Sequence, residues 1–228
     1  MGRSGTKDSS RIKGTGGDKM SFLSLFYPQM RKLPDSRFNK NISLLQYLRS
    51  TTLFVDGLIE SGDIMTTIWK KGIKSLLPKY FRPQKILLLG LAGGCNARLI
   101  NQYFPKSQIT AVEIDPYMVE IGKKYFRLGK VKNMEIVIAD ALTFVNELKA
   151  KDQFDLVMVD CFVGKAIPEK LESVAFFQKL KAHSRYVLVN RLWWYKDKIK
   201  SAQVMRNLSP YFFFTKVHTR SNVVISLV

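Results

Sequence analysis

Residues 85–98, KILLLGLAGGCNAR, are the feature that most restricts the fold. A continuous apolar run of this kind is typical of a strand that is buried on both faces of a parallel sheet. Small residues follow at once, namely Gly90, Ala92, Gly93 and Gly94. Such residues let a backbone approach a ligand closely, and the N–H groups at the start of a following helix attract anions. The segment therefore predicts either a structural turn or a loop that holds a cofactor.

Strands and helices alternate after residue 85. The predicted strands are KILLLGL (85–91), QITAVEID (108–115), MEIVIAD (134–140), FDLVMVDCF (154–162), RYVLVNRLW (185–193), FFFTKVHTR (212–220) and NVVISLV (222–228). Helical patterns separate the first four, which predicts a parallel sheet with right-handed crossovers. The last two runs are close enough in sequence to form an antiparallel hairpin. The predicted fold class is therefore α/β, with a seven-stranded, mostly parallel sheet and an antiparallel C-terminal hairpin.

The chain ahead of this sheet divides into smaller parts. We expect a disordered basic tail over 1–20, a small β-hairpin unit over 21–65, a linking helix over 66–84 and the sheet domain over 85–228. The tail is rich in Gly, Ser and Lys and poor in apolar residues, so it cannot offset its ordering entropy, and the sequence leaves open whether it is native. Asp56-Gly57 between two β-rich runs predicts a hairpin turn.

The composition of the chain indicates which classes of partner it can attract. The chain carries 37 Lys and Arg against 18 Asp and Glu, a formal net charge of +19. Such a field attracts nucleic acid, acidic proteins or anionic membrane surfaces, although a merely solvated basic surface is the alternative. We find no run long enough to span a bilayer, no signal peptide and no cysteine spacing typical of zinc or disulfides, so we expect no metal and a cytoplasmic location.

Acidic residues end the second and third predicted strands. Glu113 lies 23 residues after Gly90, a spacing at which a carboxylate can accept the ribose hydroxyls of a nucleotide. Asp140, followed by Ala141, can receive an adenine amino group. Each has a plainer alternative as a residue at the start of a helix, but the three signals fall in register on consecutive strands.

These motifs resemble those of the spermidine synthase family, a branch of the Rossmann-like methyltransferase superfamily. The resemblance covers most of the chain after residue 37 and rests on LFVDGLIESGD, LLLGLAGG, AVEID, IADA and FDLVMVDCF. It implies a Rossmann-like sheet, ribose binding by Glu113, adenine binding by Asp140 and a place for Asp160 at the reacting centre. It also implies a homodimer.

Departures from the family pattern change the expected reaction. Aminopropyltransferases of this family carry an aspartate in the glycine loop where this chain has Gly93, and a second carboxylate where it has Val163. The glutamine of the family's hairpin is Glu60 here. Without those carboxylates, S-adenosylmethionine becomes a better cofactor than its decarboxylated form.

We therefore expect methyl transfer from S-adenosylmethionine to an unknown nucleophile. Asp160 would act as a general base or orient an amine, with capping of the next turn as its plainer role. Candidate substrate residues are Glu60, Asp63, Phe162 and Trp193. The alternatives are a divergent polyamine aminopropyltransferase that uses decarboxylated S-adenosylmethionine, and a non-catalytic nucleotide- or nucleic-acid-binding protein with the same fold.

Overall fold

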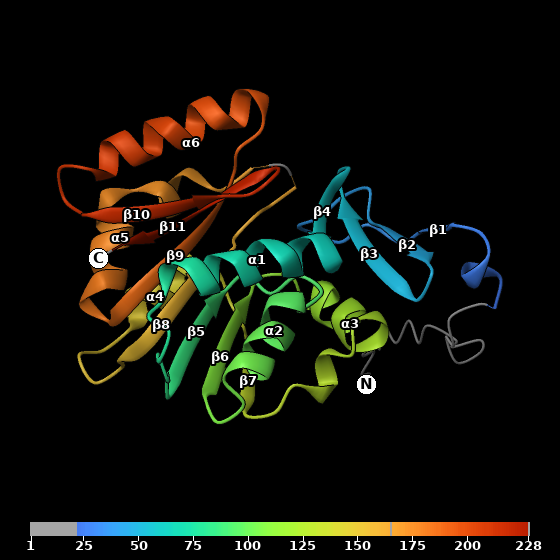
Figure 1. The fold of residues 1–228 in the computed structure, drawn as a ribbon, viewed down its shortest axis with the longest axis horizontal. Helices are drawn as coiled ribbons and strands as arrows, with labels where there is room; N and C mark the ends of the chain where they lie inside the picture. Colours follow the sequence, from blue (N-terminus) through green and yellow to red (C-terminus); the bar gives the residue numbers. More distant parts are fainter. Residues whose placement is uncertain (1–21, 165, 228) are drawn as a thin grey trace, which may run out of the picture.

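A computed structural model of the chain describes residues 22–164 and 166–227. Its main sheet has seven strands in the order β10-β11-β9-β8-β5-β6-β7 (Figure 1). The strands are β5 (Lys85–Leu89), β6 (Gln108–Glu113), β7 (Met134–Ile138), β8 (Phe154–Val159), β9 (Ser184–Leu192), β10 (Phe214–His218) and β11 (Asn222–Leu227). Strands β5 to β9 are parallel, whereas β11 runs antiparallel to both β9 and β10. The predicted fold class is confirmed.

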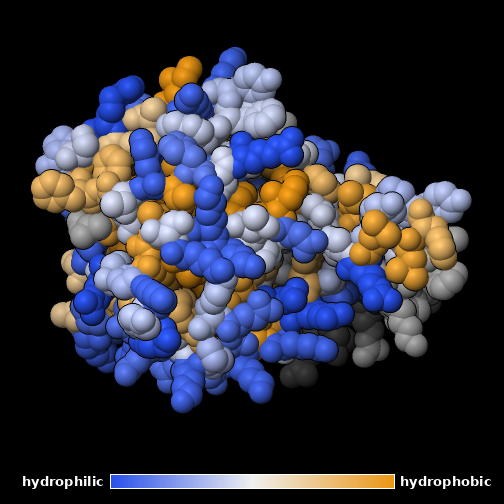
Figure 2. All heavy atoms as spheres, in the orientation of Figure 1, coloured by the Kyte–Doolittle hydropathy of each residue, from blue (hydrophilic) through white to orange (hydrophobic). Residues whose placement is uncertain are grey.

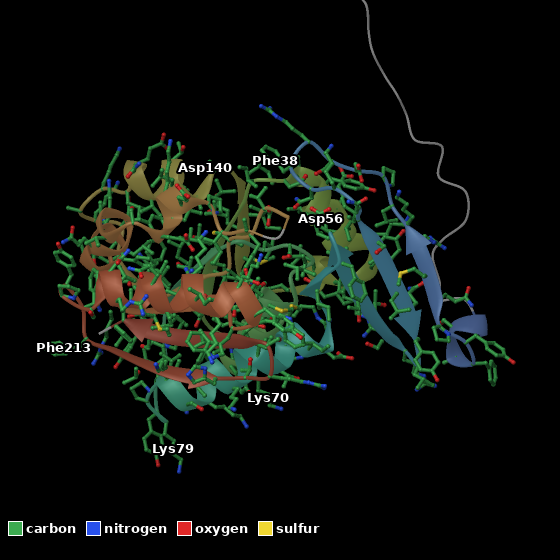
Figure 3. The ribbon with its side chains drawn as sticks, turned by 90° about the horizontal axis from the view of Figure 1, so that it is seen from above. Phe38, Asp56, Lys70, Lys79, Asp140 and Phe213 are labelled. Carbon is green, nitrogen blue, oxygen red and sulfur yellow. The ribbon has the colours of Figure 1, made fainter. Side chains whose placement is uncertain are left out.

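Helices cover both faces of this sheet. They are α1 (Asp63–Leu76), α2 (Cys95–Tyr103), α3 (Pro116–Tyr125), α4 (Ala141–Glu147), α5 (Val174–Ala182) and α6 (Tyr195–Leu208), with 3-10 turns η1 (Phe22–Leu25), η2 (Leu128–Lys130) and η3 (Glu169–Glu172). One apolar core packs α1 and α2 against the sheet, and a second packs α4, α5 and α6 against its other face. Figure 3 shows Lys70 of α1, and Lys79 in the segment after it, on one side of the molecule and Asp140 on the other.

Strand order reverses beside β5, because β6 lies on one side of it and β8 on the other. In open α/β sheets a ligand crevice forms at such a switch point, beyond the carboxyl ends of the strands. The glycine loop after β5 therefore lies where the architecture places a binding site.

A four-stranded antiparallel sheet precedes α1. It consists of β1 (Gln29–Lys32), β2 (Ser43–Tyr47), β3 (Ser50–Val55) and β4 (Leu58–Ser61). The predicted turn at Asp56-Gly57 joins β3 to β4, and both residues have positive φ, 49° and 82°. The core of this sheet, including Leu44 and Leu53, packs on Met118 and Ile121 of α3. The small sheet is thus attached to the main sheet next to the end of β6.

The remaining predictions concern the linking helix, the N-terminal tail, membrane spans, partners and location. The linking helix expected over 66–84 begins earlier, at Asp63, and ends at Leu76, because Pro78 cannot continue a helix. The predicted tail, residues 1–20, lies outside the described residues. Across the described residues, no helix has both the length and the apolar character needed to cross a membrane. The homodimer, the nucleic-acid partner and the cytoplasmic location stay predictions.

One hydrogen bond joins the small sheet directly to the glycine loop. Ser61 at the end of β4 is fully buried, and its Oγ accepts the N–H of Gly93 at 2.9 Å. A second contact lies nearby, where Asn39 Nδ2 donates to Asp115 Oδ2 at 2.7 Å. The small sheet therefore braces the loop on which the site depends.

We expect Ser61→Ala to lower the free energy of unfolding by about 1–3 kcal/mol, because it leaves the Gly93 N–H buried without an acceptor. Urea unfolding measures this loss. Ser209→Ala, which removes an exposed hydroxyl from the end of α6, is the control and should change stability by less than about 0.5 kcal/mol. Equal stability of the Ser61 variant and the parent chain would contradict the bracing role.

Candidate active site

The backbone of the glycine loop is held in conformations that require small residues. Gly90 has φ 86°, and a Cβ there would lie 2.2 Å from the carbonyl oxygen of Asp160. Gly94 has φ 80°, and its Cβ would lie 2.3 Å from Leu128. Ala92 adopts φ 46° although it is not a glycine. The loop is therefore a tightly packed turn, with Gly90 and Ala92 lining a cleft.

Glu113 holds this loop in place. Its Oε2 accepts the N–H groups of Leu91 and Ala92 at 2.9 and 2.8 Å, and its Oε1 accepts the N–H of Asp115 at 3.0 Å. Burial raises the pKa of the carboxyl, and the three N–H donors oppose that rise. The side chain lines the cleft with its orientation set by backbone groups, so its remaining lone pairs can accept hydroxyl groups of a ligand.

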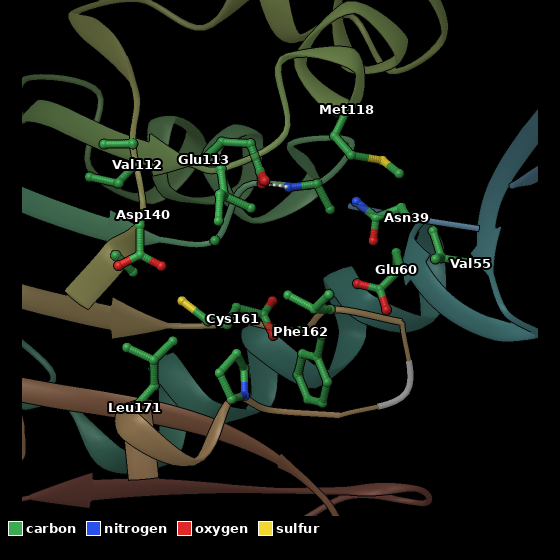
Figure 4. Close-up of a pocket in the computed structure, with 18 residues that line it drawn as sticks. Asn39, Val55, Glu60, Val112, Glu113, Met118, Asp140, Cys161, Phe162 and Leu171 are labelled. Carbon is green, nitrogen blue, oxygen red and sulfur yellow. Dashed lines mark hydrogen bonds between the residues drawn. The ribbon is translucent and has the colours of Figure 1, made fainter. Parts of the chain in front are cut away.

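Figure 4 shows Asp140 at one end of the cleft and Glu60 at the other, with Cys161 and Phe162 between them. Asp140 caps α4, and its Oδ1 accepts the N–H of Thr143 at 2.9 Å. Four carboxylates line the cleft, and none of the described lining residues is basic. They are Glu60, Glu113, Asp140 and Asp160. The cleft is thus acidic in a strongly basic chain, which favours a cationic ligand.

Asp160 is oriented by two donors. Its Oδ2 accepts the indole N–H of Trp69 at 2.8 Å, and its Oδ1 accepts Asn190 Nδ2 at 2.8 Å. The series of hydrogen bonds extends further from Asp160, because Asn190 Oδ1 accepts a hydrogen bond from Asn222 Nδ2 at 3.0 Å. Trp69, Asn190 and Asn222 are all buried. The carboxylate therefore has a fixed direction at the end of β8.

Two carboxyl groups of the cleft have strongly raised pKa values. Burial, with the charges of Asp160 and Glu113, raises the pKa of Glu60 to about 8. Burial also raises the pKa of Asp160 to about 6, against the effect of its donors Asn190 and Trp69. Both groups consequently titrate close to neutral pH, the range in which a carboxyl group can exchange protons with a substrate.

A second cavity, of about 350 Å³, adjoins the cleft. Glu60 and Phe162 line both spaces. The second cavity is otherwise largely apolar, with lining from α1, β4 and the start of α6, and it includes Trp194. The two spaces thus share one wall, formed by Glu60 and Phe162.

The loop that carries Phe162 is tied down at its far end. Glu172 Oε1 pairs with Arg191 on β9 at 2.6 Å, and its Oε2 pairs with Lys200 on α6 at 3.0 Å. The Arg191 and Glu172 side chains are both buried. This ion pair holds the loop over the carboxyl edge of the sheet.

The structure brings most of the predicted site residues together. Lining the cleft or the second cavity are Glu60, Gly90, Ala92, Glu113, Asp140, Ala141, Asp160 and Phe162. Gly93 and Gly94 shape the loop from behind, against Ser61 and Leu128.

Asp63 and Trp193 lie outside both spaces. Asp63 accepts a hydrogen bond from Ser50 at the start of α1. Trp193 packs against His218 at 4.7 Å between ring centroids, and its neighbour Trp194 lines the second cavity instead. Successive residues at a strand end point to opposite sides, so the sequence could not distinguish the two tryptophans.

Trp69 and Asn190 were not predicted as site residues. Trp69 falls at a core position on the apolar face of a helix, so the sequence gives no sign that its N–H group donates to Asp160. Asn190 had a readable signal, because a polar residue inside the apolar run RYVLVNRLW needs a buried partner.

The fold and site together define a class of protein: an α/β protein whose glycine loop and acidic strand ends line a cleft at the carboxyl edge of a parallel sheet. A family model of the spermine/spermidine synthase domain matches residues 73–222. The chain belongs to the spermine/spermidine synthase family, as its motifs indicate.

Curated relatives fall into two groups. A polyamine aminopropyltransferase of Vibrio vulnificus (strain CMCP6) is 32% identical over 101 residues, which cover 44% of this chain and 34% of that protein. An eEF1A lysine and N-terminal methyltransferase homolog of Drosophila pseudoobscura pseudoobscura is 40% identical over 84 residues, which cover 36% of this chain and 12% of that protein. The matched segments are thus only part of each relative.

One similar solved structure is also of a methyltransferase-like protein. The crystal structure of human methyltransferase-like protein 13 in complex with SAH is 26% identical, with a TM-score of 0.55 over 64% of this chain and 71% of that one. The family match therefore supports a transferase. The names of the relatives differ in the group that is transferred, which is aminopropyl in one set and methyl in the other.

We expect Glu60→Gln to flatten the pH dependence of stability. Between pH 4.5 and about 8 the folded chain keeps the Glu60 proton that the unfolded chain has lost, so the free energy of unfolding falls as pH rises. Glutamine stays neutral and removes this decline. Urea unfolding across that range measures it, with the exposed Glu135→Gln as control. Parallel curves for Glu60→Gln and the parent would contradict the raised pKa.

Proposed function

We propose that this chain transfers a methyl group from S-adenosylmethionine to an amine. The observation that favours methyl transfer is the close packing of the glycine loop at Gly93. A Cβ at Gly93 would lie 2.8 Å from Ser61 Oγ and 3.0 Å from the Phe126 ring. The loop therefore has neither the aspartate of aminopropyltransferases nor space for one without displacing these neighbours.

The residues of the cleft fit an adenosyl cofactor. Glu113 presents a fixed carboxylate for a ribose diol, and Asp140 presents one near the adenine position. Ile114, Met118 and Leu171 supply apolar lining for a flat ring. The cavity within the cleft is small, about 50 Å³. Typical ligand pockets measure about 300–1,000 Å³, so binding requires the lining side chains to move apart.

The chemistry asked of the chain is positioning and proton transfer. Bound S-adenosylmethionine would supply an electrophilic methyl group on a sulfonium. An amine attacks it only through a neutral nitrogen, and an arriving ammonium must first lose a proton. Asp160, fixed by Trp69 and Asn190, can orient that nitrogen, and its pKa of about 6 suits proton acceptance near neutral pH, whereas Glu60, with a pKa of about 8, keeps its proton there.

Aminopropyl transfer is the second candidate. It is supported by the family match and by the polyamine aminopropyltransferase of Vibrio vulnificus. Glu60 and Asp160 would hold a diamine in this case. A binding protein without catalysis is the third candidate, supported only by the net charge of +19.

Calorimetric titration separates the donors. We expect S-adenosylmethionine to bind at least about tenfold more tightly than its decarboxylated form, because no loop carboxylate receives the aminopropyl ammonium; tenfold corresponds to about 1.4 kcal/mol. Glu113→Gln should weaken binding by a similar factor through loss of a charged acceptor, with Glu135→Gln as the matched control. Preference for the decarboxylated donor would favour aminopropyl transfer, and no binding of either would favour the third candidate.

Asp160→Asn tests the reacting centre. We expect it to reduce transfer of labelled methyl groups from S-adenosylmethionine to cell-extract acceptors by at least about a hundredfold, within the usual effect of removing a general base. Cofactor affinity by calorimetry should stay within about threefold, since Glu113 and the loop are untouched. Unchanged transfer would exclude Asp160 from the reaction.

A further inference from the structure

The second cavity has a composition that suits one cationic head on an apolar stem. Its walls include Leu58, Ile59, Ile64, Met65, Ile68, Leu192 and Trp194. Carboxyl groups lie at two places, Glu60 at the border with the cleft and Asp197 on α6. None of its described lining residues is basic. A polyamine would place further charges against apolar side chains, which costs free energy unless each charge finds a partner.

Large exposed apolar side chains lie on α1 and at the start of α6, two of the elements that line this cavity. Trp194 and Tyr195 pack on each other, with ring centroids 5.2 Å apart, and are 52% and 81% exposed. Ile64 and Ile199 are also exposed, by 52% and 70%. Figure 2 shows hydrophobic residues in the notch between the upper part of the molecule, where α6 lies, and the small sheet, with hydrophilic residues around them. A free small molecule needs no such surface, whereas a macromolecular partner does.

A group of basic side chains lies on elements that line the second cavity or pair with such elements: Lys71 on α1, Lys198 on α6, and Lys216 and His218 on β10. Lys71 Nζ donates to the backbone oxygen of His218 at 2.7 Å, and Lys198 Nζ lies 5.6 Å from the Trp193 ring, which packs on His218. The three lysine charges act together with burial to lower the pKa of His218. We call these four residues the basic cluster.

The basic cluster is linked to the cavity through the backbone. Trp193 N donates to Ser221 O at 2.8 Å, and both Ser221 and the next residue after Trp193, Trp194, line the cavity. The face thus combines an acidic, apolar cavity with a positive border. Such a face is complementary to a partner whose amine enters the cavity and whose acidic groups stay outside it, next to the basic cluster.

We propose that this face binds an acidic segment of a protein, and that the second cavity takes an amine of that segment, on a lysine side chain or at a chain terminus. The proposal rests on the proposed function, since it names the acceptor of the same reaction. Nucleic acid is the weaker occupant: phosphates would contact the basic cluster, but the apolar walls and the Asp197 carboxylate disfavour them in the cavity.

Fluorescence anisotropy with short labelled peptides tests the proposal in the presence of S-adenosylhomocysteine. The peptides share one central lysine, which is flanked by glutamates, by serines or by arginines. We expect the glutamate-flanked peptide to bind at least about tenfold more tightly than the serine-flanked one, with an affinity that falls as salt rises. Replacing its central lysine by alanine should weaken binding severalfold.

Charge-reversal variants locate the surface. Lys71→Glu, Lys198→Glu and Lys216→Glu together should weaken the glutamate-flanked peptide by at least about tenfold. The matched control reverses Lys106, Lys132 and Lys151, exposed residues that precede β6, β7 and β8 at the opposite edge of the sheet. It has the same net charge and should stay within about twofold of the parent. A Lys198→Glu single variant covers the case in which the triple variant does not fold.

Equal binding of the glutamate- and serine-flanked peptides would overturn the proposal. So would equal losses in the two triple variants, or single-stranded RNA that binds more tightly than any peptide and depends on the basic cluster. Peptide binding of the expected pattern, in a chain that calorimetry shows to bind no adenosyl donor, would uphold the docking surface and contradict only the proposed transfer.

Discussion

Three backbone N–H groups that converge on one carboxylate are the interaction on which the site depends. Glu113 ends β6, yet two of its three bonds reach Leu91 and Ala92 in the loop after β5. Hydrogen bonds to a charged group contribute about 1.5–3 kcal/mol each, whereas left-handed backbone at a residue such as Ala92 costs about 1–2 kcal/mol. The carboxylate therefore stabilises a loop that would otherwise be strained. Loop shape and the acceptor offered to a ligand come from the same side chain.

Asp160, at the end of β8, is held in a similar way, but by neutral donors. Asp160 is held between the indole of Trp69 and the amide of Asn190, and Asn190 is held in turn by Asn222. Buried polar groups without partners are costly, so each member of this chain restricts the others to one arrangement. Neutral donors fix the direction of the carboxylate without a salt bridge that would lower its pKa far below neutral. Orientation and a near-neutral pKa are compatible for that reason.

The main sheet could be predicted from sequence because its signal is local and repeated. Continuous apolar runs such as 85–91 specify buried strands, and acids at 113 and 140 fall where those strands end. The turn at Asp56-Gly57 could be predicted because glycine adopts positive φ. The turn at Leu48-Arg49 could not, since both residues adopt positive φ, 47° and 65°, without a residue type that favours it. The pairing of Tyr47 with Ser50 across the two-residue β2–β3 connection requires that turn.

The site was predictable only in part, for a related physical reason. A residue's own position on a strand can be read, as for Glu113 and Asp160, but its partners depend on pairing across the sheet. Asn190 meets Asp160 because β8 and β9 are parallel neighbours, and Asn222 joins because β11 returns antiparallel beside β9. These contacts link residues about 30 positions apart, and a single sequence carries no record of that pairing.

The wall shared by the cleft and the second cavity restricts how this protein can diverge. Glu60 and Phe162 each face both spaces, whereas Met65 and Trp194 face only the second. A substitution at either shared position changes the walls of both spaces at once, so their shapes cannot vary independently there. Positions that line the second cavity alone, such as those on α1 and at the start of α6, can change without altering the cleft.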